Sequence, residues 1–245
     1  MANPFFRFRE FTVWHDRCAM KVGTDGVLLG AWANAETAAH ILDVGTGTGL
    51  IALMLAQRSA TADIDAIDIS PDAFLQAESN VAVSPFAHRI TVHLASLAEH
   101  RRAHAEAAHA YPYDLIVSNP PYFNASLKSP QAQRNLARHD DRLPLTSLLA
   151  DAAAMLADRG KLALILPPER FDAIRLWLPT HGLRLTRLTQ VLPRAGLPPK
   201  RILFELCRNG NESDAAEPAA ATLVLESPAG SLSPAYRQLT APYYL

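Results

Sequence analysis

Short apolar runs alternate along the chain with stretches in which apolar residues recur every three or four positions. The runs predict buried strands, and the recurring pattern predicts helices between them. The expected strands are 41–45, 63–69, 90–94, 115–117, 161–166, 183–192 and 201–207, with a small one at 222–226. The expected helices are 50–58, 71–83, an alanine-rich segment around 100–109, 145–157, 168–179 and 234–245. Five strand–helix units followed by two closing strands predict a doubly wound α/β domain with a mostly parallel sheet.

Several local signals set the expected helix ends. Thr24 or Asp25 is expected to cap a helix that starts in the glycine-containing stretch 21–30. Ser70 is expected to cap the helix at 71–83. Gly160 is expected to close the helix at 145–157. Residues 1–40 show no sheet element, so we interpret them as an N-terminal extension and residues 41–245 as the α/β domain.

The apolar run at 115–117 ends abruptly before Asn119-Pro120-Pro121-Tyr122. Proline lacks an N–H and has a fixed φ, so two prolines end the strand and place Asn119 at its carboxyl end, where open α/β sheets bind ligands. The amide oxygen of Asn119, the carbonyl oxygen of Pro120 and the ring of Tyr122 suit a planar group that carries an NH2. A plain turn with Tyr122 covering the core is the alternative.

A glycine turn follows the first expected strand, with glycines at 45, 47 and 49. Backbone N–H groups at such a turn, and at the helix that follows, suit a ligand. The spacing departs from the dinucleotide fingerprint, because Leu50 stands in place of the last glycine. Asp43, inside the strand end, would repel a pyrophosphate but can pair with a cation. The turn therefore indicates a cationic nucleoside ligand.

Asp68 ends the next expected strand, 68 − 45 = 23 residues after Gly45. An acid about 20 residues beyond the first glycine reaches ribose hydroxyls in nucleotide-binding folds. An ordinary strand-end carboxylate is the alternative for Asp68. His100 and His104 are spaced for a metal, but no third ligand is evident nearby, so we expect a solvated helix face and no metal site.

Composition and charge narrow the functional classes. The chain of 245 residues is 49% hydrophobic and has only two cysteines, Cys18 and Cys207. We therefore expect one sizeable core, or a core with a small annex, no disulfide framework and a cytoplasmic protein. No apolar run approaches the roughly 20 residues that span a bilayer, and the first residues do not form a secretory signal.

The formal net charge is −1, but the charges are unevenly distributed. Residues 170–201 hold seven basic residues and one acid, a net of +6, whereas 209–226 hold four acids and no base. The polar segment 123–144 is also basic and too long for a simple connection. Its candidate functional residues are Lys128, Arg134, Arg138 and His139. A charged but inert surface loop is the alternative.

The motifs together resemble those of S-adenosylmethionine-dependent amino-group methyltransferases, and the strand order with its closing hairpin is similar to their seven-stranded fold. The resemblance rests on Asp43-x-Gly45-x-Gly47-x-Gly49, on Asp68 and on Asn119-Pro-Pro-Tyr122. Residues 15–32 resemble the N-terminal signature of the bacterial tRNA(Val) adenine-37 N6-methyltransferase family. Segments 53–58, 133–138 and 235–245 are also similar to that family.

This resemblance implies transfer of a methyl group from S-adenosylmethionine to N6 of an adenine in the anticodon loop of tRNA. The implied catalytic residues are Asn119, Pro120, Pro121 and Tyr122. The implied cofactor contacts are Lys21, Thr24, Asp25, Asp43, Gly45, Thr46, Gly47, Gly49, Asp68, Ser96 and Asn119. From the distribution of basic charge, the expected RNA contacts are Lys128, Arg134, Arg138, His139, Arg194, Lys200 and Arg201. Ser96 departs from the pattern, since such enzymes often carry an acid there. The extension 1–40 is expected to pack on the cofactor and substrate side.

Three other functions use similar features. N5-methylation of a protein glutamine presents the same NH2 to an Asn-Pro-Pro-Tyr corner. A DNA adenine or RNA guanine methyltransferase is a further rival. A noncatalytic RNA-binding module with a relict cofactor site is the third, and the intact glycines, Asp68 and Asn119 argue against it.

Overall fold

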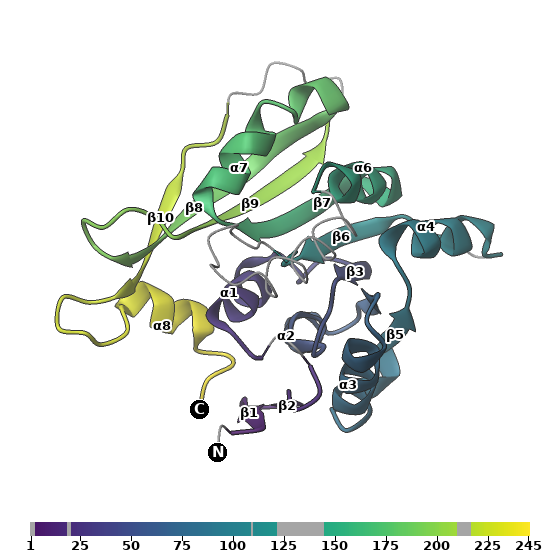
Figure 1. Cartoon of the computed structure of the whole chain (residues 1–245), viewed down its shortest axis with the longest axis horizontal. Helices are drawn as coiled ribbons and strands as arrows, with labels where there is room; N and C mark the ends of the chain where they lie inside the picture. The colour runs from purple at the N-terminus through teal and green to yellow at the C-terminus, as the bar shows by residue number, and fades with distance from the viewer. Residues whose placement is uncertain (1–2, 19–20, 109, 122–144, 210–216) are drawn as a thin grey trace, which may run out of the picture.

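The computed structural model describes residues 3–18, 21–108, 110–121, 145–209 and 217–245 (Figure 1). One eight-stranded sheet forms the centre of this part of the chain. Its strands are β3 (His40–Val44), β4 (Asp63–Asp68), β5 (Ile90–Leu94), β6 (Tyr113–Ser118), β7 (Leu156–Leu166), β8 (Leu183–Arg194), β9 (Arg201–Arg208) and β10 (Ala221–Glu226). Their order across the sheet is β10-β8-β9-β7-β6-β3-β4-β5.

Helices cover both faces of this sheet (Figure 1). The α-helices are α1 (Thr24–Trp32), α2 (Leu50–Arg58), α3 (Pro71–Ala82), α4 (Leu97–Glu106), α6 (Leu145–Met155), α7 (Pro168–Arg175) and α8 (Pro234–Thr240), with short 3-10 turns η1 (Ala87–Arg89) and η2 (Pro179–His181). One core lies under α1, α2 and α8, and a second lies under α4, α6 and α7. Successive strand residues enter opposite cores, as Ile41 and Leu42 do, because side chains alternate across a strand.

The order of the strands places the ligand-binding edge. β3 pairs in parallel with both β4 and β6, and the chain proceeds outward from it in both directions. β9 is antiparallel to β7 and β8. The carboxyl ends of β3, β4 and β6 therefore meet at one edge, which also holds the start of β9. Ligands bind at such switch points in open α/β sheets.

These observations confirm the predicted doubly wound, mostly parallel sheet, with eight strands in place of seven. The additional strand is β10, which was expected only as a small separate strand. It joins the sheet in parallel beside β8. This pairing covers the edge of β8, and β10 becomes the edge strand of the sheet.

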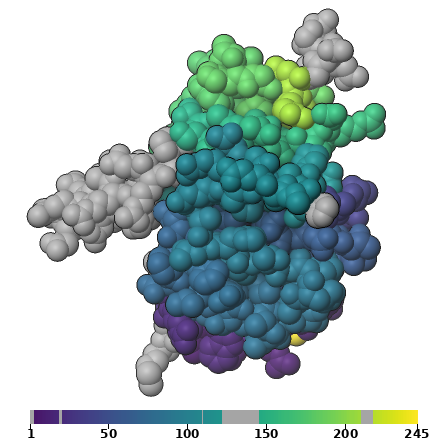
Figure 2. Space-filling model, turned by 90° about the vertical axis from the view of Figure 1, so that its right-hand side faces the viewer, coloured from purple at the N-terminus to yellow at the C-terminus, as the bar shows by residue number. Residues whose placement is uncertain are grey.

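The N-terminal segment contains a sheet element that the sequence did not predict. β1 (Phe5–Arg7) pairs antiparallel with β2 (Thr12–Trp14). Each strand has three residues, too few to show a period of two. Phe8 and Phe11 between them are buried, at 1% and 5% exposure, and their rings stack. In the turned view this segment lies at the foot of the molecule (Figure 2).

The predicted end of the helix at 145–157 was wrong. α6 ends at Met155 and β7 begins at Leu156, so Gly160 lies inside a strand and caps no helix. A Cβ on Gly160 would stand 2.6 Å from the carbonyl oxygen of Tyr113. The register between β6 and β7 shifts at this point. Gly160 is therefore required because a neighbouring backbone approaches closely at an irregularity of the sheet.

The predicted solvated histidine face was also wrong. His100 is 7% exposed and one of its ring nitrogens lies 2.9 Å from the Tyr113 hydroxyl. Tyr113 donates to Asp65, which His93 also contacts at 2.7 Å. Burial is the largest influence on the Asp65 carboxyl and raises its pKa, but these hydrogen bonds and one from Tyr111 together lower the pKa to about 2. The group forms a hydrogen-bonded network beneath α4.

Replacing His100 with glutamine should reduce the loss of stability on acidification. Burial lowers the pKa of His100 to about 4 from 6.5; Asp65 opposes this shift, and His93 and His104 add to it. The unfolded chain therefore binds a proton that the folded chain excludes, so stability falls as pH drops from 6.5 towards 4, by roughly 2–3 kcal/mol. Urea unfolding at pH 7.5 and at pH 4.5 measures this. An equal pH dependence in both proteins would contradict the assignment.

None of the helices in the described ranges is both long and apolar enough to cross a lipid bilayer.

Candidate active site

The glycine turn has a backbone that only glycine adopts readily. Gly45, Gly47 and Gly49 have φ of +74°, +57° and +80°. A Cβ on Gly45 would meet no atom within 4 Å, whereas one on Gly49 would touch Ala77 at 3.5 Å. The turn is thus packed against α3 at Gly49 and leaves open space at Gly45. A ligand can approach the backbone closely there.

Asp43 lies at the end of β3 directly below this turn and is fully buried. Its Oδ2 accepts hydrogen bonds from the Thr46 hydroxyl at 2.7 Å and from the backbone N–H of Ala52 at 3.2 Å. Its Oδ1 is buried and has no hydrogen-bond partner among the described residues. Burial, the largest cause, raises the pKa of Asp43 to about 7. A donor or a cation above the turn would satisfy this oxygen and lower that pKa.

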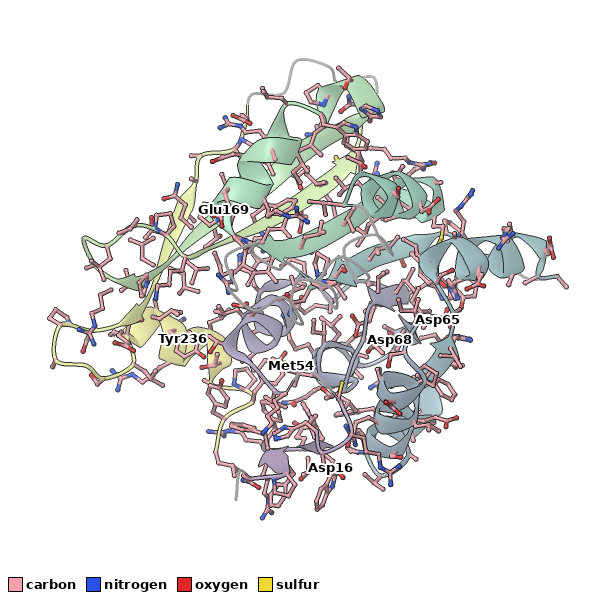
Figure 3. All side chains as sticks on the ribbon, in the orientation of Figure 1. Asp16, Met54, Asp65, Asp68, Glu169 and Tyr236 are labelled. Atoms are coloured by element: carbon pink, nitrogen blue, oxygen red, sulfur yellow. The ribbon has the colours of Figure 1, made fainter. Side chains whose placement is uncertain are left out.

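Asp68 ends β4, the neighbouring strand, and Figure 3 labels it together with Asp65 of the same strand. Its Oδ2 accepts the backbone N–H of Gly47, and its Oδ1 accepts that of Ser70, both at 2.9 Å. Asp68 therefore holds the glycine turn and the start of α3 in place. Each carboxylate oxygen has a second lone pair, so Asp68 can also accept from a ligand hydroxyl.

Asn119 follows β6 on the other side of β3. Ser118 ties the strand end to β3, since its hydroxyl donates to the carbonyl oxygen of Val44 at 2.9 Å. The Oδ1 of Asn119 is buried and without a hydrogen-bond partner among the described residues. Pro120 is buried and Pro121 is exposed. Tyr122 lies outside the described residues, so the predicted stacking ring is not placed.

The N-terminal segment passes over α3 and the glycine turn. The buried side chain of Asn80 on α3 donates to the carbonyl oxygens of Trp14 and Thr48, both at 2.8 Å, and accepts from the Trp14 N–H at 2.9 Å. A Cβ on Gly47 would lie 3.9 Å from the Cys18 sulfur. The segment before α1 is therefore held against the turn.

The predicted cap of α1 was wrong. The N-cap is Gly23, in an extended conformation, and none of the described side chains caps the helix. Lys21 and Thr24 are exposed. Asp25 forms an ion pair with Arg201, with 2.9 Å between Oδ2 and Nε. This long-range pair withdraws the Asp25 carboxylate from capping.

Ser96 caps α4 and is engaged with Glu99. Its hydroxyl accepts from the Glu99 N–H at 3.2 Å, and its own backbone N–H donates to Glu99 Oε2 at 2.9 Å, which makes a reciprocal capping box. The Ser96 hydroxyl also donates to Glu99 Oε2 at 2.6 Å. The hydrogen bonds from Ser96 lower the pKa of Glu99. Glu99 thus brings a carboxylate to the end of β5, next to the position where the resemblance expects an acid. The Ser-x-x-Glu spacing was the sequence signal for it.

The candidate RNA contacts fall into two groups. Four of them, Lys128, Arg134, Arg138 and His139, lie outside the described residues. The other three flank the turn between β8 and β9. Arg194 pairs with Glu226 of β10 at 2.9 Å, and Arg201 pairs with Asp25. Lys200 is exposed and forms no ion pair with a described residue.

The net charge of +6 counted over residues 170–201 is largely neutralised in the folded protein by acidic side chains next to the arginines. Besides Arg194 and Arg201, Arg175 pairs with Glu217. The Cζ of Arg187 lies 3.4 Å from the centroid of the Trp32 ring, and the Nε of Arg187 lies 3.9 Å from Oε2 of Glu205. The acids come from other segments, so the positive field expected here is weaker than the sequence count implies.

No group of three or more histidine, cysteine or acidic side chains able to hold a metal ion occurs in the part of the chain that the structure describes.

Comparison with known proteins gives a consistent result. The model of the methyltransferase small domain matches residues 20–170. A Parabacteroides distasonis protein named tRNA1(Val) (adenine(37)-N6)-methyltransferase is 51% identical over 100% of this chain and 99% of its own length. A protein of the same name from Aeromonas hydrophila is 44% identical over 99% and 98%.

Among solved structures, a predicted O-methyltransferase from Agrobacterium tumefaciens superposes with a TM-score of 0.66 at 21% identity, covering 89% of this chain and 96% of that chain. This similarity bears on the fold alone. The family match and the full-length relatives together show that the chain belongs to the methyltransferase small-domain family, in the group of the tRNA1(Val) (adenine(37)-N6)-methyltransferases.

Proposed function

We propose that this protein transfers a methyl group from S-adenosylmethionine to N6 of adenine 37 in valine tRNA, in the cytoplasm. The observation that carries the proposal is the buried Oδ1 of Asn119 at the end of β6, which has no hydrogen-bond partner among the described residues. It lies at the same sheet edge as the open turn at Gly45 and the Oδ1 of Asp43, which no described residue contacts by a hydrogen bond either. Full-length relatives that carry this activity in their names support the choice of substrate.

The residues around the glycine turn fit the proposed cofactor. S-adenosylmethionine is a cationic nucleoside that supplies a methyl group from a sulfonium. Asp43 would offer a buried hydrogen-bond acceptor to the ammonium group of the cofactor. The backbone of Gly45 is open to a ligand, and the turn is completed by Thr46, Gly47 and Gly49. Asp68 would accept from the ribose hydroxyls. Ser96 and Glu99 would face the base, and Lys21 and Thr24 would approach from the N-terminal extension.

Asn119 would act on the nucleophile. The lone pair of an adenine amine is delocalised into the ring, so the amine is a poor nucleophile. The adenine amine would donate one hydrogen bond to Asn119 Oδ1 and another to the Pro120 carbonyl oxygen. These two hydrogen bonds would pull the nitrogen towards tetrahedral geometry. Positive charge develops on that nitrogen during transfer, so these acceptors bind the transition state more tightly than the ground state.

Positioning supplies the remainder of the rate enhancement. Pro120 and Pro121 hold the corner rigid, and alignment of the reacting atoms can contribute about 7–11 kcal/mol. Tyr122 would stack on the adenine once the base leaves its loop, which is least costly for an unpaired nucleotide. The proton leaves to water after transfer, so no strong base is required.

For the RNA, we propose contacts from the segment after Tyr122, through Lys128, Arg134, Arg138 and His139, and from Arg194 and Lys200 at the β8–β9 turn. Arg194 would have to exchange its pairing with Glu226 for a phosphate. Exposed pairs of this kind are worth about 0–1 kcal/mol, so the exchange is inexpensive.

Purified protein should methylate tRNA from cells that lack the gene and should yield N6-methyladenosine on nucleoside digestion. Free adenosine and duplex DNA should be poor substrates, because neither presents an unpaired base beside several phosphates in the way that a folded anticodon loop does. Mass spectrometry of the digest identifies the nucleoside. Methylation of a release factor in place of tRNA would favour the glutamine reaction.

A further inference from the structure

Asp25 and Arg201 are far apart in sequence, yet they form one half-buried ion pair. Arg201 Nε lies 2.9 Å from Asp25 Oδ2, and the side chains are 28% and 23% exposed. Arg201 also donates from Nη1 to the carbonyl oxygen of Lys200 at 2.7 Å. The pair joins the first turn of α1 to the first residue of β9, and the sequence suggested separate roles for the two residues.

The Asp25 end of the pair is fixed relative to the glycine turn. Gly26 and Gly30 of α1 pack against α2, and a Cβ on them would lie 3.0 Å from Leu50 Cδ2 and 2.8 Å from Met54 Sδ. Arg58 of α2 donates to the carbonyl oxygens of Gly30 and Ala31. Since α2 begins directly after the turn, α1 and the turn form one packed unit.

The Arg201 end lies at the base of the β8–β9 turn. Arg201 is opposite Val191 in the register, and the Lys200 N–H donates to the Val191 carbonyl oxygen at 2.9 Å. The far end of α1 holds the same hairpin, because Trp32 Nε1 donates to Thr189 Oγ1 at 3.1 Å. Helix α1 is therefore attached to the hairpin at both ends.

We propose that the Asp25–Arg201 pair is a positioning link between the glycine turn and the β8–β9 turn. It sets the orientation of the turn that carries Lys200, so that an RNA bound by this turn presents its base at Asn119. The inference rests on the proposed function. It assigns Asp25 no direct contact with the cofactor and Arg201 no direct contact with a phosphate.

The variants Asp25→Asn, Arg201→Gln, the double variant and the exchange Asp25→Arg/Arg201→Asp test the link. We expect each single change to raise KM for folded tRNA about threefold to tenfold, the range of a partly buried pair. The double variant should be no worse than either single one, because both remove the same contact. The exchange should recover part of the loss. The dissociation constant of S-adenosylmethionine, measured by calorimetry, should change less than about twofold.

Arg208→Gln is the matched control. Arg208 ends the same strand at the opposite sheet edge and pairs with Asp158 at 2.9 Å. Its loss should leave KM for tRNA unchanged. Calorimetry with the cofactor also shows that each variant folds. If Asp25→Asn does not fold, Asp25→Glu and Arg201→Lys keep both charges while altering the geometry, and should raise KM for tRNA in the same direction.

Three results would overturn the link. A lower KM for tRNA in Asp25→Asn would mean that the carboxylate only repels RNA. If Arg201→Gln reduces the salt dependence of tRNA binding by the equivalent of about one phosphate contact, the guanidinium of Arg201 contacts the RNA backbone directly. Weaker cofactor binding in Asp25→Asn would place the carboxylate on the cofactor. If the wild-type protein does not methylate tRNA, the proposed function fails; if it does and the variants match it, only this inference fails.

Discussion

Asn119→Ala should lower kcat on tRNA by about 10²–10³-fold, the effect of removing one preorganised transition-state contact. The Oδ1 of Asn119 is buried and has no hydrogen-bond partner among the described residues, so none of them uses its capacity to accept a hydrogen bond. The bond strengthens as the nitrogen gains positive charge, so turnover should fall far more than cofactor binding. Single-turnover kinetics with saturating tRNA and cofactor measure the effect on the chemical step.

Asn119→Asp is the matched variant, because it keeps an oxygen at the same position. It should retain more turnover than the alanine variant. Cofactor affinity, followed by calorimetry, should stay within about twofold of wild type in the alanine variant. If the turnover of Asn119→Ala also stayed within about twofold, the Pro120 carbonyl oxygen would have to suffice and the mechanism would be wrong.

Asp68→Ala should weaken S-adenosylmethionine binding by about 1.5–3 kcal/mol, roughly 10- to 100-fold, the scale of charge-assisted hydrogen bonds. Two losses contribute to this effect. The ribose hydroxyls would lose their proposed acceptor, and the N–H groups of Gly47 and Ser70 would lose the one that they have in the structure. The glycine turn then becomes less well held. Calorimetric titration with the cofactor measures the combined change.

Asp63→Ala is the matched control for this prediction. Asp63 is an exposed acid at the other end of β4, so its removal should leave cofactor affinity unchanged. Asp68→Asn keeps one oxygen, which can accept from only one of the two backbone N–H groups, and it places an NH2 donor against the other, so it should also weaken cofactor binding. Unchanged cofactor binding in Asp68→Ala would remove this residue from the cofactor site.

The local pattern was sufficient for most elements of the sheet. The helix Leu50–Arg58 and the strand Ile90–Leu94 have the predicted bounds. Asp43, Asp68 and Asn119 stand at strand ends as predicted, because an apolar run and the glycine, serine or proline after it are neighbours in the chain. Parallel pairing of β3 with β4 follows from the helix that crosses over between them. The placement of β6 on the other side of β3 is seen only in the structure.

Local pattern failed where a distant partner decided the outcome. His100 looked like part of a solvated helix face, yet it is buried against Tyr113, because β6 brings that ring beneath α4. Gly160 looked like a helix cap, yet the approach of the Tyr113 carbonyl places it in a strand. In both cases packing from another strand outweighed a weak local preference.

The charged residues show most clearly the difference between what the local sequence indicates and what distant contacts decide. The positions of the basic residues can be counted along the chain, and the run from 170 to 201 predicted a surface for a polyanion. The pairing of Arg194 with Glu226 and of Arg201 with Asp25 depends on how the strands and helices pack, so no count along the chain could predict it. Partners 32 and 176 residues away neutralise these arginines. A Coulomb interaction depends on distance in space, so a count along the chain cannot tell which charges remain available to a ligand.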